Sequence, residues 1–112
     1  MALAIIFRPV SMTAAQYDDV IRRLELAGAG SPPGRTYHAC FGSGQKLAVF
    51  DVWESQEAFD AFGRTLMPIL GEVGVDPGLP EVAPLHDEIV VEEPVSPGRV
   101  WARARVRRRG PT

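Results

Sequence analysis

The segment from Leu47 to Phe62, LAVFDVWESQEAFDAF, constrains the fold of this chain more than any other. Its first seven residues are apolar apart from Asp51, which predicts a strand that is covered on both faces. Ser55 is a good N-cap for a helix, and Glu57 lies in the first turn, where the helix dipole favours an anion. An apolar stripe at helical spacing predicts that this helix packs on a sheet. The stripe consists of Phe59, Phe62, Leu66, Ile69 and Val73.

The rest of the chain divides into elements by the same reasoning. A first helix begins at Thr13, where Thr13 and Gln16 form a capping box, and it ends at Gly28. Pro68 removes a backbone donor inside the second helix and is expected to kink it. The buried face of the first helix is predicted to comprise Tyr17, Val20, Ile21, Leu24 and Ala27. The predicted elements are, in order, a strand at 2–8, a helix between 13 and 28, a hairpin of strands at 36–41 and 47–53, a helix at 56–73, and a fourth strand at 85–92 after an extended, Pro-rich segment.

The order β-α-β-β-α-β predicts an α+β, ferredoxin-like fold, in which an antiparallel four-stranded sheet carries both helices on one face. Two helices cannot cover both faces of the sheet. The other face also has apolar and aromatic candidates from each strand, so we expect a second copy of the chain to cover it in a homodimer. A chain of 112 residues suits a single domain, which we place at residues 1–93.

The charge divides the chain near its C-terminal end. Residues 1–98 contain six basic and fourteen acidic side chains, whereas residues 99–112 contain six arginines and no acidic residue. Between Arg99 and Arg107, small apolar residues alternate with arginine or tryptophan, which predicts a fifth, edge strand within a C-terminal extension at residues 94–112. A disordered tail and a nucleic-acid contact are the alternatives, although the acidic body argues against a dedicated nucleic-acid module.

The chain lacks an apolar run long enough to span a bilayer, and Met1 leads directly into a strand-like segment without a basic region or a cleavage site. We therefore expect a cytoplasmic protein without membrane contact. Cys40 has no second cysteine with which to pair, and on a strand it is expected to be a small buried hydrophobe without a catalytic role. The sequence contains no phosphate-binding glycine motif and no metal-ligand cluster.

From residue 2 to residue 92, the chain resembles the dimeric α/β-barrel proteins of the antibiotic biosynthesis monooxygenase type. The resemblance rests on the element order and on three motifs, Val52-Trp53-Glu54-Ser55, Glu57-Ala58-Phe59 and Leu66-Met67-Pro68. It implies that two sheets pair into a barrel whose interior holds a small molecule. The family includes oxygenases of aromatic polyketides that need no cofactor, haem-degrading enzymes and many small proteins without an assigned activity, and the fold does not choose among them.

Few polar residues lie on the predicted strands, and these are the candidates for a site. His38 and His86 titrate in the range that suits a general base, and Asp51 could orient a histidine or accept a hydrogen bond from a phenolic substrate. These three residues are the predicted catalytic groups. The predicted substrate-binding residues are Arg8, Tyr37 and Trp53. Two histidines alone do not make a metal site.

Strand alternation places Asp51 and Trp53 on one face of the third strand. We expect this face to point into the barrel and the other face to pack beneath the helices; the other face comprises Ala48, Phe50 and Val52. Each candidate also has a structural interpretation. Trp53 could serve core packing alone, Asp51 could be a salt-bridged or capping carboxylate, and each histidine could be a hydrogen-bonded or exposed structural residue.

The resemblance implies an oxidation in which a base deprotonates an electron-rich aromatic substrate, whose anion then reduces O₂ in a dry pocket without a cofactor or metal. Several family members use asparagine beside tryptophan and histidine, and this chain contains no asparagine. Haem-degrading members bind iron through a helix histidine, which neither predicted helix contains. The expected function is monooxygenase-like oxidation of an aromatic or polyketide-type molecule. The alternatives are a non-catalytic dimeric ligand-binding or accessory protein, and a cyclase or isomerase.

Overall fold

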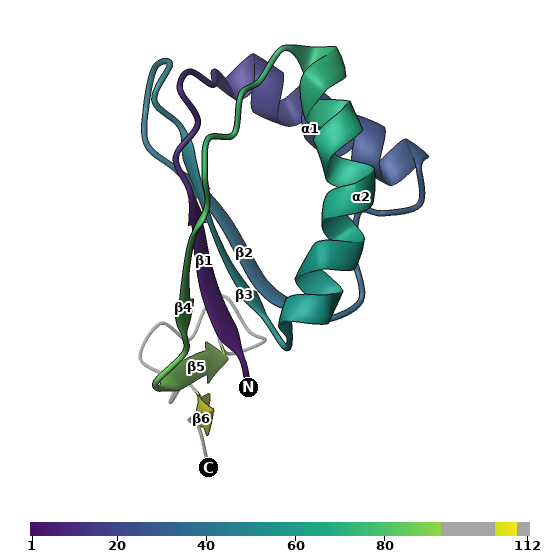
Figure 1. Ribbon diagram of the computed structural model, residues 1–112. Coiled ribbons are helices and arrows are strands. Elements are labelled where there is room, and N and C mark those ends of the chain that lie inside the picture. Colours follow the sequence, from purple (N-terminus) through teal and green to yellow (C-terminus); the bar gives the residue numbers. More distant parts are fainter. Residues whose placement is uncertain (93–104, 110–112) are drawn as a thin grey trace, which may run out of the picture.

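The computed structural model describes residues 1–92 and 105–109, and its main domain is one antiparallel sheet with two helices (Figure 1). The elements are β1 (Leu3–Phe7), α1 (Ala14–Leu26), β2 (Arg35–Phe41), β3 (Ala48–Trp53), α2 (Gln56–Val73), β4 (Glu81–Pro84), β5 (Glu88–Glu92) and β6 (Arg105–Arg109). The first four strands form the sheet in the order β2-β3-β1-β4, and β5 pairs with β6 in a separate ribbon. The α+β, ferredoxin-like prediction is confirmed.

Both helices begin where the sequence predicts. The backbone N–H of Gln16 donates to Thr13 Oγ1 at 3.2 Å, and the Thr13 N–H donates to Gln16 Oε1 at 2.9 Å, which completes the capping box of α1. Ser55 Oγ accepts from the N–H of Ala58 at 3.1 Å at the start of α2. The two helices lie on the same side of the sheet (Figure 1). We call the side toward the helices the inner face and the opposite side the outer face.

The fourth strand of the sheet is not the predicted one. Glu81–Pro84 forms β4 and pairs with β1, with Ile5 opposite Val82, whereas the predicted strand at 85–92 leaves the sheet and contributes β5 to the ribbon. β4 lies at the edge of the sheet, so it has a hydrogen-bonding neighbour on only one side. An edge strand tolerates proline because a missing donor can fall on its unpaired side, and for this reason a Pro-rich segment could serve here.

The two faces of the sheet are the reverse of the prediction. Ile5 and Trp53 point toward the helices and have no exposed surface, and the Trp53 ring lies 5.3 Å from the ring of Phe62 on α2. Alternation then places on the outer face the three residues that were expected beneath the helices, Ala48, Phe50 and Val52. Both sets of β3 residues are largely apolar, so hydrophobicity alone did not distinguish the two faces.

The C-terminal segment contributes the predicted extra strand, but not to the sheet. β6 pairs with β5 in antiparallel register, with Glu88 opposite Arg109 and Glu92 opposite Arg105. The first part of the strand predicted from Arg99 lies outside the described residues. No helix within residues 1–92 is both long and apolar enough to cross a bilayer.

Candidate functional site

A cavity of about 60 Å³ lies between the inner face of the sheet and the two helices. Four polar side chains line it: Tyr17 from α1, Arg35 and His38 from β2, and Asp51 from β3. The remaining lining residues are apolar, namely Phe7, Pro9, Met12, Val20, Ile21, Leu24, Val49, Phe62, Leu66, Leu70, Val75 and Pro77. An apolar pocket with a few convergent polar groups is the usual form of a small-molecule site.

Three of the polar residues form a continuous hydrogen-bonded chain. The register of the hairpin places His38 directly opposite Asp51, and His38 Nδ1 lies 2.5 Å from Asp51 Oδ1. On the other side of the ring, His38 Nε2 lies 2.6 Å from the hydroxyl of Tyr17, which α1 brings over the sheet. Asp51 is only 3% exposed, so this chain runs from a buried carboxylate to the wall of the cavity.

The direction of these hydrogen bonds follows from what each group can do. A carboxylate can only accept, so Nδ1 of His38 carries a proton and donates it to Asp51. In the neutral imidazole, Nε2 then has a lone pair and accepts from the Tyr17 hydroxyl. Asp51 therefore selects the tautomer in which His38 presents a basic nitrogen to the hydroxyl of Tyr17.

The surroundings of Tyr17 keep its hydroxyl protonated. Burial raises the pKa of Tyr17 above its ordinary value of 10.0, and the neighbouring Cys40 and Asp51 act in the same direction, whereas the positive charge of Arg35 opposes them. Tyr17 therefore donates to His38 at neutral pH. Burial likewise raises the pKa of the Cys40 thiol, which disfavours the reactive thiolate.

Trp53 supports the site from within the core and does not line the cavity. Its ring packs between Phe59 and Phe62 of α2, at centroid distances of 5.6 and 5.3 Å. Its indole Nε1–H donates to Asp51 Oδ2 at 3.4 Å, so the second carboxylate oxygen also has a partner. The indole thus combines the predicted core packing with a role in holding the carboxylate of Asp51.

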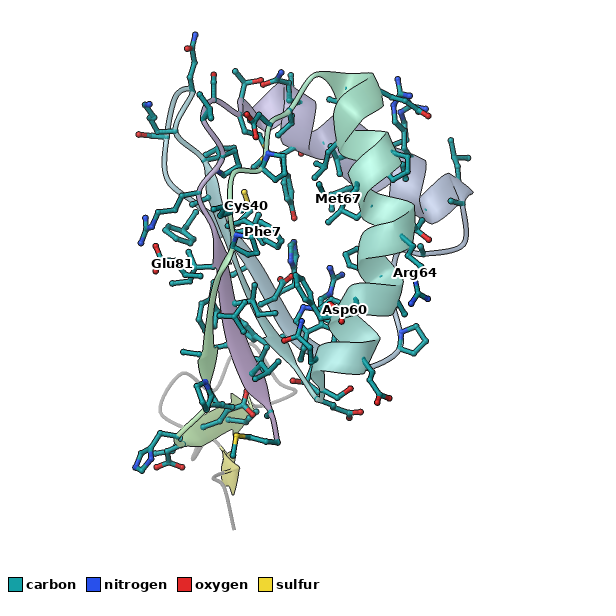
Figure 2. All side chains as sticks on the ribbon, viewed as in Figure 1. Phe7, Cys40, Asp60, Arg64, Met67 and Glu81 are labelled. Carbon is teal, nitrogen blue, oxygen red and sulfur yellow. The ribbon has the colours of Figure 1, made fainter. Side chains whose placement is uncertain are left out.

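Three of the six predicted site residues come together, and three do not. His38 and Asp51 line the cavity with Trp53 beside them, but His86 is exposed in the connection between β4 and β5. Tyr37 is 51% exposed on the outer face. Arg8 is exposed and forms an ion pair with Glu81, which lies on the side of the sheet away from the helices (Figure 2). The predicted catalytic role of His86 therefore has no geometric support, nor do the binding roles of Tyr37 and Arg8.

The sequence interpretation missed two polar residues of the cavity. Tyr17 was assigned to the buried face of the first helix, and the signal overlooked was a single hydroxyl among aliphatic neighbours on that face. Arg35 lies at the end of a Pro/Gly loop, and no sequence pattern marked it as a site residue. Its side chain reaches the inner face because of an irregularity in β2, which the sequence does not reveal. Within the described part of the chain, no group of three or more histidine, cysteine, aspartate or glutamate side chains is arranged to hold a metal ion.

Comparison with solved structures identifies the fold. SnoaB, a cofactor-independent oxygenase from Streptomyces nogalater, aligns with a TM-score of 0.57 and 14% identity, over 74% of this chain and 91% of that one. A candidate antibiotic biosynthesis monooxygenase from Chloroflexus aurantiacus aligns with a TM-score of 0.53 and 18% identity, over the same shares of the two chains. The chain has the antibiotic biosynthesis monooxygenase fold. No protein-family model and no curated protein sequence matches it. At such low sequence identity, the similarity to these two structures establishes the fold and gives no evidence for a particular activity.

Proposed function

We propose that this chain is a monooxygenase-like enzyme that oxidises a small aromatic molecule with O₂, without a cofactor, in the cavity between the sheet and the helices. The observation that carries the proposal is the hydrogen-bonded chain Asp51–His38–Tyr17, which ends at a cavity whose remaining lining is apolar except for Arg35. A buried carboxylate that orients an imidazole is a common arrangement for a general base. The cofactor-independent activity of SnoaB, which has the same fold, agrees with this chemistry.

The first step is the removal of a proton from a phenolic substrate. Tyr17 passes its own proton to His38 Nε2 while it takes the proton of the substrate, so Tyr17 ends unchanged. The resulting imidazolium is stabilised by Asp51 through the hydrogen bond at Nδ1. In this scheme His38 is the base and Tyr17 is the relay, while Asp51 holds the tautomer.

The aromatic anion then reacts with O₂ directly. One electron passes from the anion to O₂, and the two radicals combine into a peroxide anion at a ring carbon. This anion takes back the proton that His38 holds, and the resulting hydroperoxide loses water to leave a carbonyl group. For 1-naphthol the balance is 1-naphthol plus O₂ to 1,4-naphthoquinone plus water, so one oxygen atom enters the product and no external reductant is needed. The apolar lining excludes water that would otherwise protonate the anion.

The size of the cavity requires that its walls move when a substrate enters. An apolar cavity of about 150 Å³ holds one benzene molecule, whereas the cavity here has about 60 Å³. Phe62 lines both this cavity and a surface groove of about 380 Å³ between the loop before β2 and the start of α2. A rotation of the Phe62 ring would join the two spaces and make room for a ring system.

Oxidation of 1-naphthol, followed by O₂ uptake and by the absorbance of the quinone, tests the proposal. Tyr17→Phe and His38→Gln are each expected to lower kcat about 10²–10⁴-fold, the usual contribution of proton transfer by a positioned group. Tyr37→Phe is the matched control, because it removes the same hydroxyl from the outer face. Equal oxidation rates for the wild-type protein and both site variants would exclude His38 as the base and Tyr17 as the relay.

A non-catalytic ligand-binding protein is the second candidate, and one observation favours it. Asp51, His38 and Tyr17 already satisfy one another, as they would in a purely structural network. Binding of 1-naphthol without O₂ uptake, with an affinity that does not change in His38→Gln, would favour this candidate.

We also propose that the protein is a homodimer in which the outer faces of two copies meet. Both helices cover the inner face (Figure 1), while large aromatic side chains remain exposed on the outer face, among them Tyr37 at 51% and Phe41 at 44%. A contiguous exposed apolar surface is typical of a protein interface. Native mass spectrometry of the full chain measures the subunit number, and a monomer at micromolar concentration would contradict this assembly.

A further inference from the structure

We infer that Arg35 makes the cavity selective for aromatic molecules that carry a carboxylate, with the ring among the apolar side chains and the carboxylate on the guanidinium. This inference rests on the proposed function only in placing the ligand in the same cavity, and it is tested by binding rather than by turnover. It concerns a residue that has no role in the proton-transfer chain Asp51–His38–Tyr17.

A bulge in β2 turns Arg35 toward the cavity. In a regular strand, Arg35 would share a face with Tyr37, which lies on the outer face. The register against β3 shifts between these two residues, so that Arg35 lies opposite Trp53 while Tyr37 lies opposite Val52. Trp53 faces the helices, and Arg35 therefore joins His38 on the inner face. Bulges are frequent next to binding sites because they redirect one side chain in this way.

The loop before β2 holds the backbone of Arg35 in place. The N–H of Glu54 donates to the carbonyl oxygen of Gly34 at 2.8 Å, and the N–H of Arg35 donates to that of Pro32 at 3.3 Å. Gly34 has a φ of +90° and lies so close to α2 that a Cβ at this position would be 2.5 Å from the Cβ of Ala58. The bulge is thus part of a tightly packed junction, and the position of Arg35 is determined before any ligand binds.

The guanidinium of Arg35 is half-buried and has hydrogen-bonding capacity to spare. It lies over the ring of Phe62, with Cζ 5.5 Å from the ring centroid, and its Nη2 donates to the carbonyl oxygen of Gly30 at 3.3 Å. A guanidinium has five N–H donors, so this one bond leaves most of them available. No carboxylate among the described residues forms an ion pair with Arg35.

The charges around the cavity favour an anion at this position. Arg35 is the only lysine or arginine among the lining residues, and the one lining carboxylate, Asp51, is already bound by His38 and Trp53. A partly buried cation without a counter-ion is costly, and a ligand carboxylate supplies the missing charge together with a planar, bidentate fit. Before a ligand binds, the guanidinium lies against the ring of Phe62 at the apolar wall.

Salicylate and salicylamide provide a matched pair of probes, because they share one ring and one hydroxyl and differ in the charge of a single group. Isothermal titration calorimetry of the full-length protein at neutral pH is expected to show salicylate bound about 10- to 100-fold more tightly than salicylamide. In Arg35→Gln the two affinities are expected to agree within about threefold, with the affinity for salicylamide unchanged. If Arg35→Gln does not fold, Arg35→Met is the variant to use, because it keeps an unbranched side chain over Phe62.

Arg64→Gln is the control, because Arg64 is an exposed arginine on the side of α2 that faces away from the sheet (Figure 2). It removes the same charge and should leave the preference for salicylate intact. A wild-type protein that binds both probes equally, or binds neither, overturns the inference, as does a preference that survives the loss of Arg35. A preference for salicylate that depends on Arg35, in a protein that does not oxidise 1-naphthol, would support the carboxylate site and refute the oxygenase.

Discussion

Replacing Asp51 with asparagine tests the candidate site most directly, because it keeps the size of the side chain and changes only its hydrogen bonding. The carboxylate accepts from His38 Nδ1 at 2.5 Å and from Trp53 Nε1 at 3.4 Å, and it is 3% exposed. An asparagine has one accepting oxygen and one donating NH₂ group. It can therefore accept from only one of these two donors, and its NH₂ group faces the other.

The two orientations of the asparagine have different costs. If its oxygen faces His38, the indole N–H of Trp53 loses its acceptor, and an unsatisfied buried donor costs about 1–3 kcal/mol of the free energy of unfolding. If its oxygen faces Trp53, the NH₂ group donates to His38 Nδ1 and the imidazole carries its proton on Nε2. That tautomer cannot accept from Tyr17, so the rate of proton removal falls by about 10²–10⁴.

The expected result for Asp51→Asn is either a kcat for 1-naphthol that is about 10²–10⁴-fold lower or, in the other orientation, a Tm that is lower by about 4–24 °C, from about 4–8 °C per kcal/mol for a domain near this size. The assays are O₂ uptake and thermal unfolding followed by circular dichroism. Asp60→Asn is the control, because Asp60 is exposed and the side-chain amide of Gln56, which donates to it at 2.9 Å, can donate equally well to an asparagine oxygen. A rate within about threefold of wild type together with an unchanged Tm in the Asp51→Asn protein would fit neither orientation and would refute the assignment of Asp51 as the group that sets the tautomer.

Three further predictions concern stability. Gly34→Ala combines a φ of +90° with a 2.5 Å approach to Ala58 and should lower the free energy of unfolding by about 2–4 kcal/mol in urea titrations, whereas Gly44→Ala, with a φ of +61° and open space, should lower it by about 1 kcal/mol. Because the pKa of Tyr17 is raised in the folded state, the unfolded chain loses this proton first as the pH rises above 10. The Tm of the wild-type protein should therefore fall further than the Tm of Tyr17→Phe between pH 9 and pH 11. An equal loss would show that Tyr17 is not buried in this way. Trp53→Phe removes the indole donor and part of the core and should cost about 1–3 kcal/mol in the same urea titrations, and no cost would contradict its buried position.

The sequence determined the local elements of this protein, because their signals lie within a few neighbouring residues. The capping box of Thr13 and Gln16 and the N-cap at Ser55 place the helix starts, and the apolar run that ends at Trp53 places the third strand. The scarcity of polar residues on the predicted strands also made His38 and Asp51 candidates for a site. The helix and strand order was enough to predict the ferredoxin-like fold, which depends on the sequence of elements rather than on single contacts.

Only the tertiary structure decided which face of the sheet became the core and what lines the cavity. Both faces of β3 are apolar, so the choice between them depended on the packing of Trp53 against α2. The same choice excluded Tyr37 from the cavity and brought Tyr17 of α1 to His38. Arg35 reached the inner face through a single bulge, and one extra residue in a strand reverses the side to which a residue points without changing the hydrophobic pattern. Such effects arise from contacts between distant segments, which a pattern read along the chain does not contain.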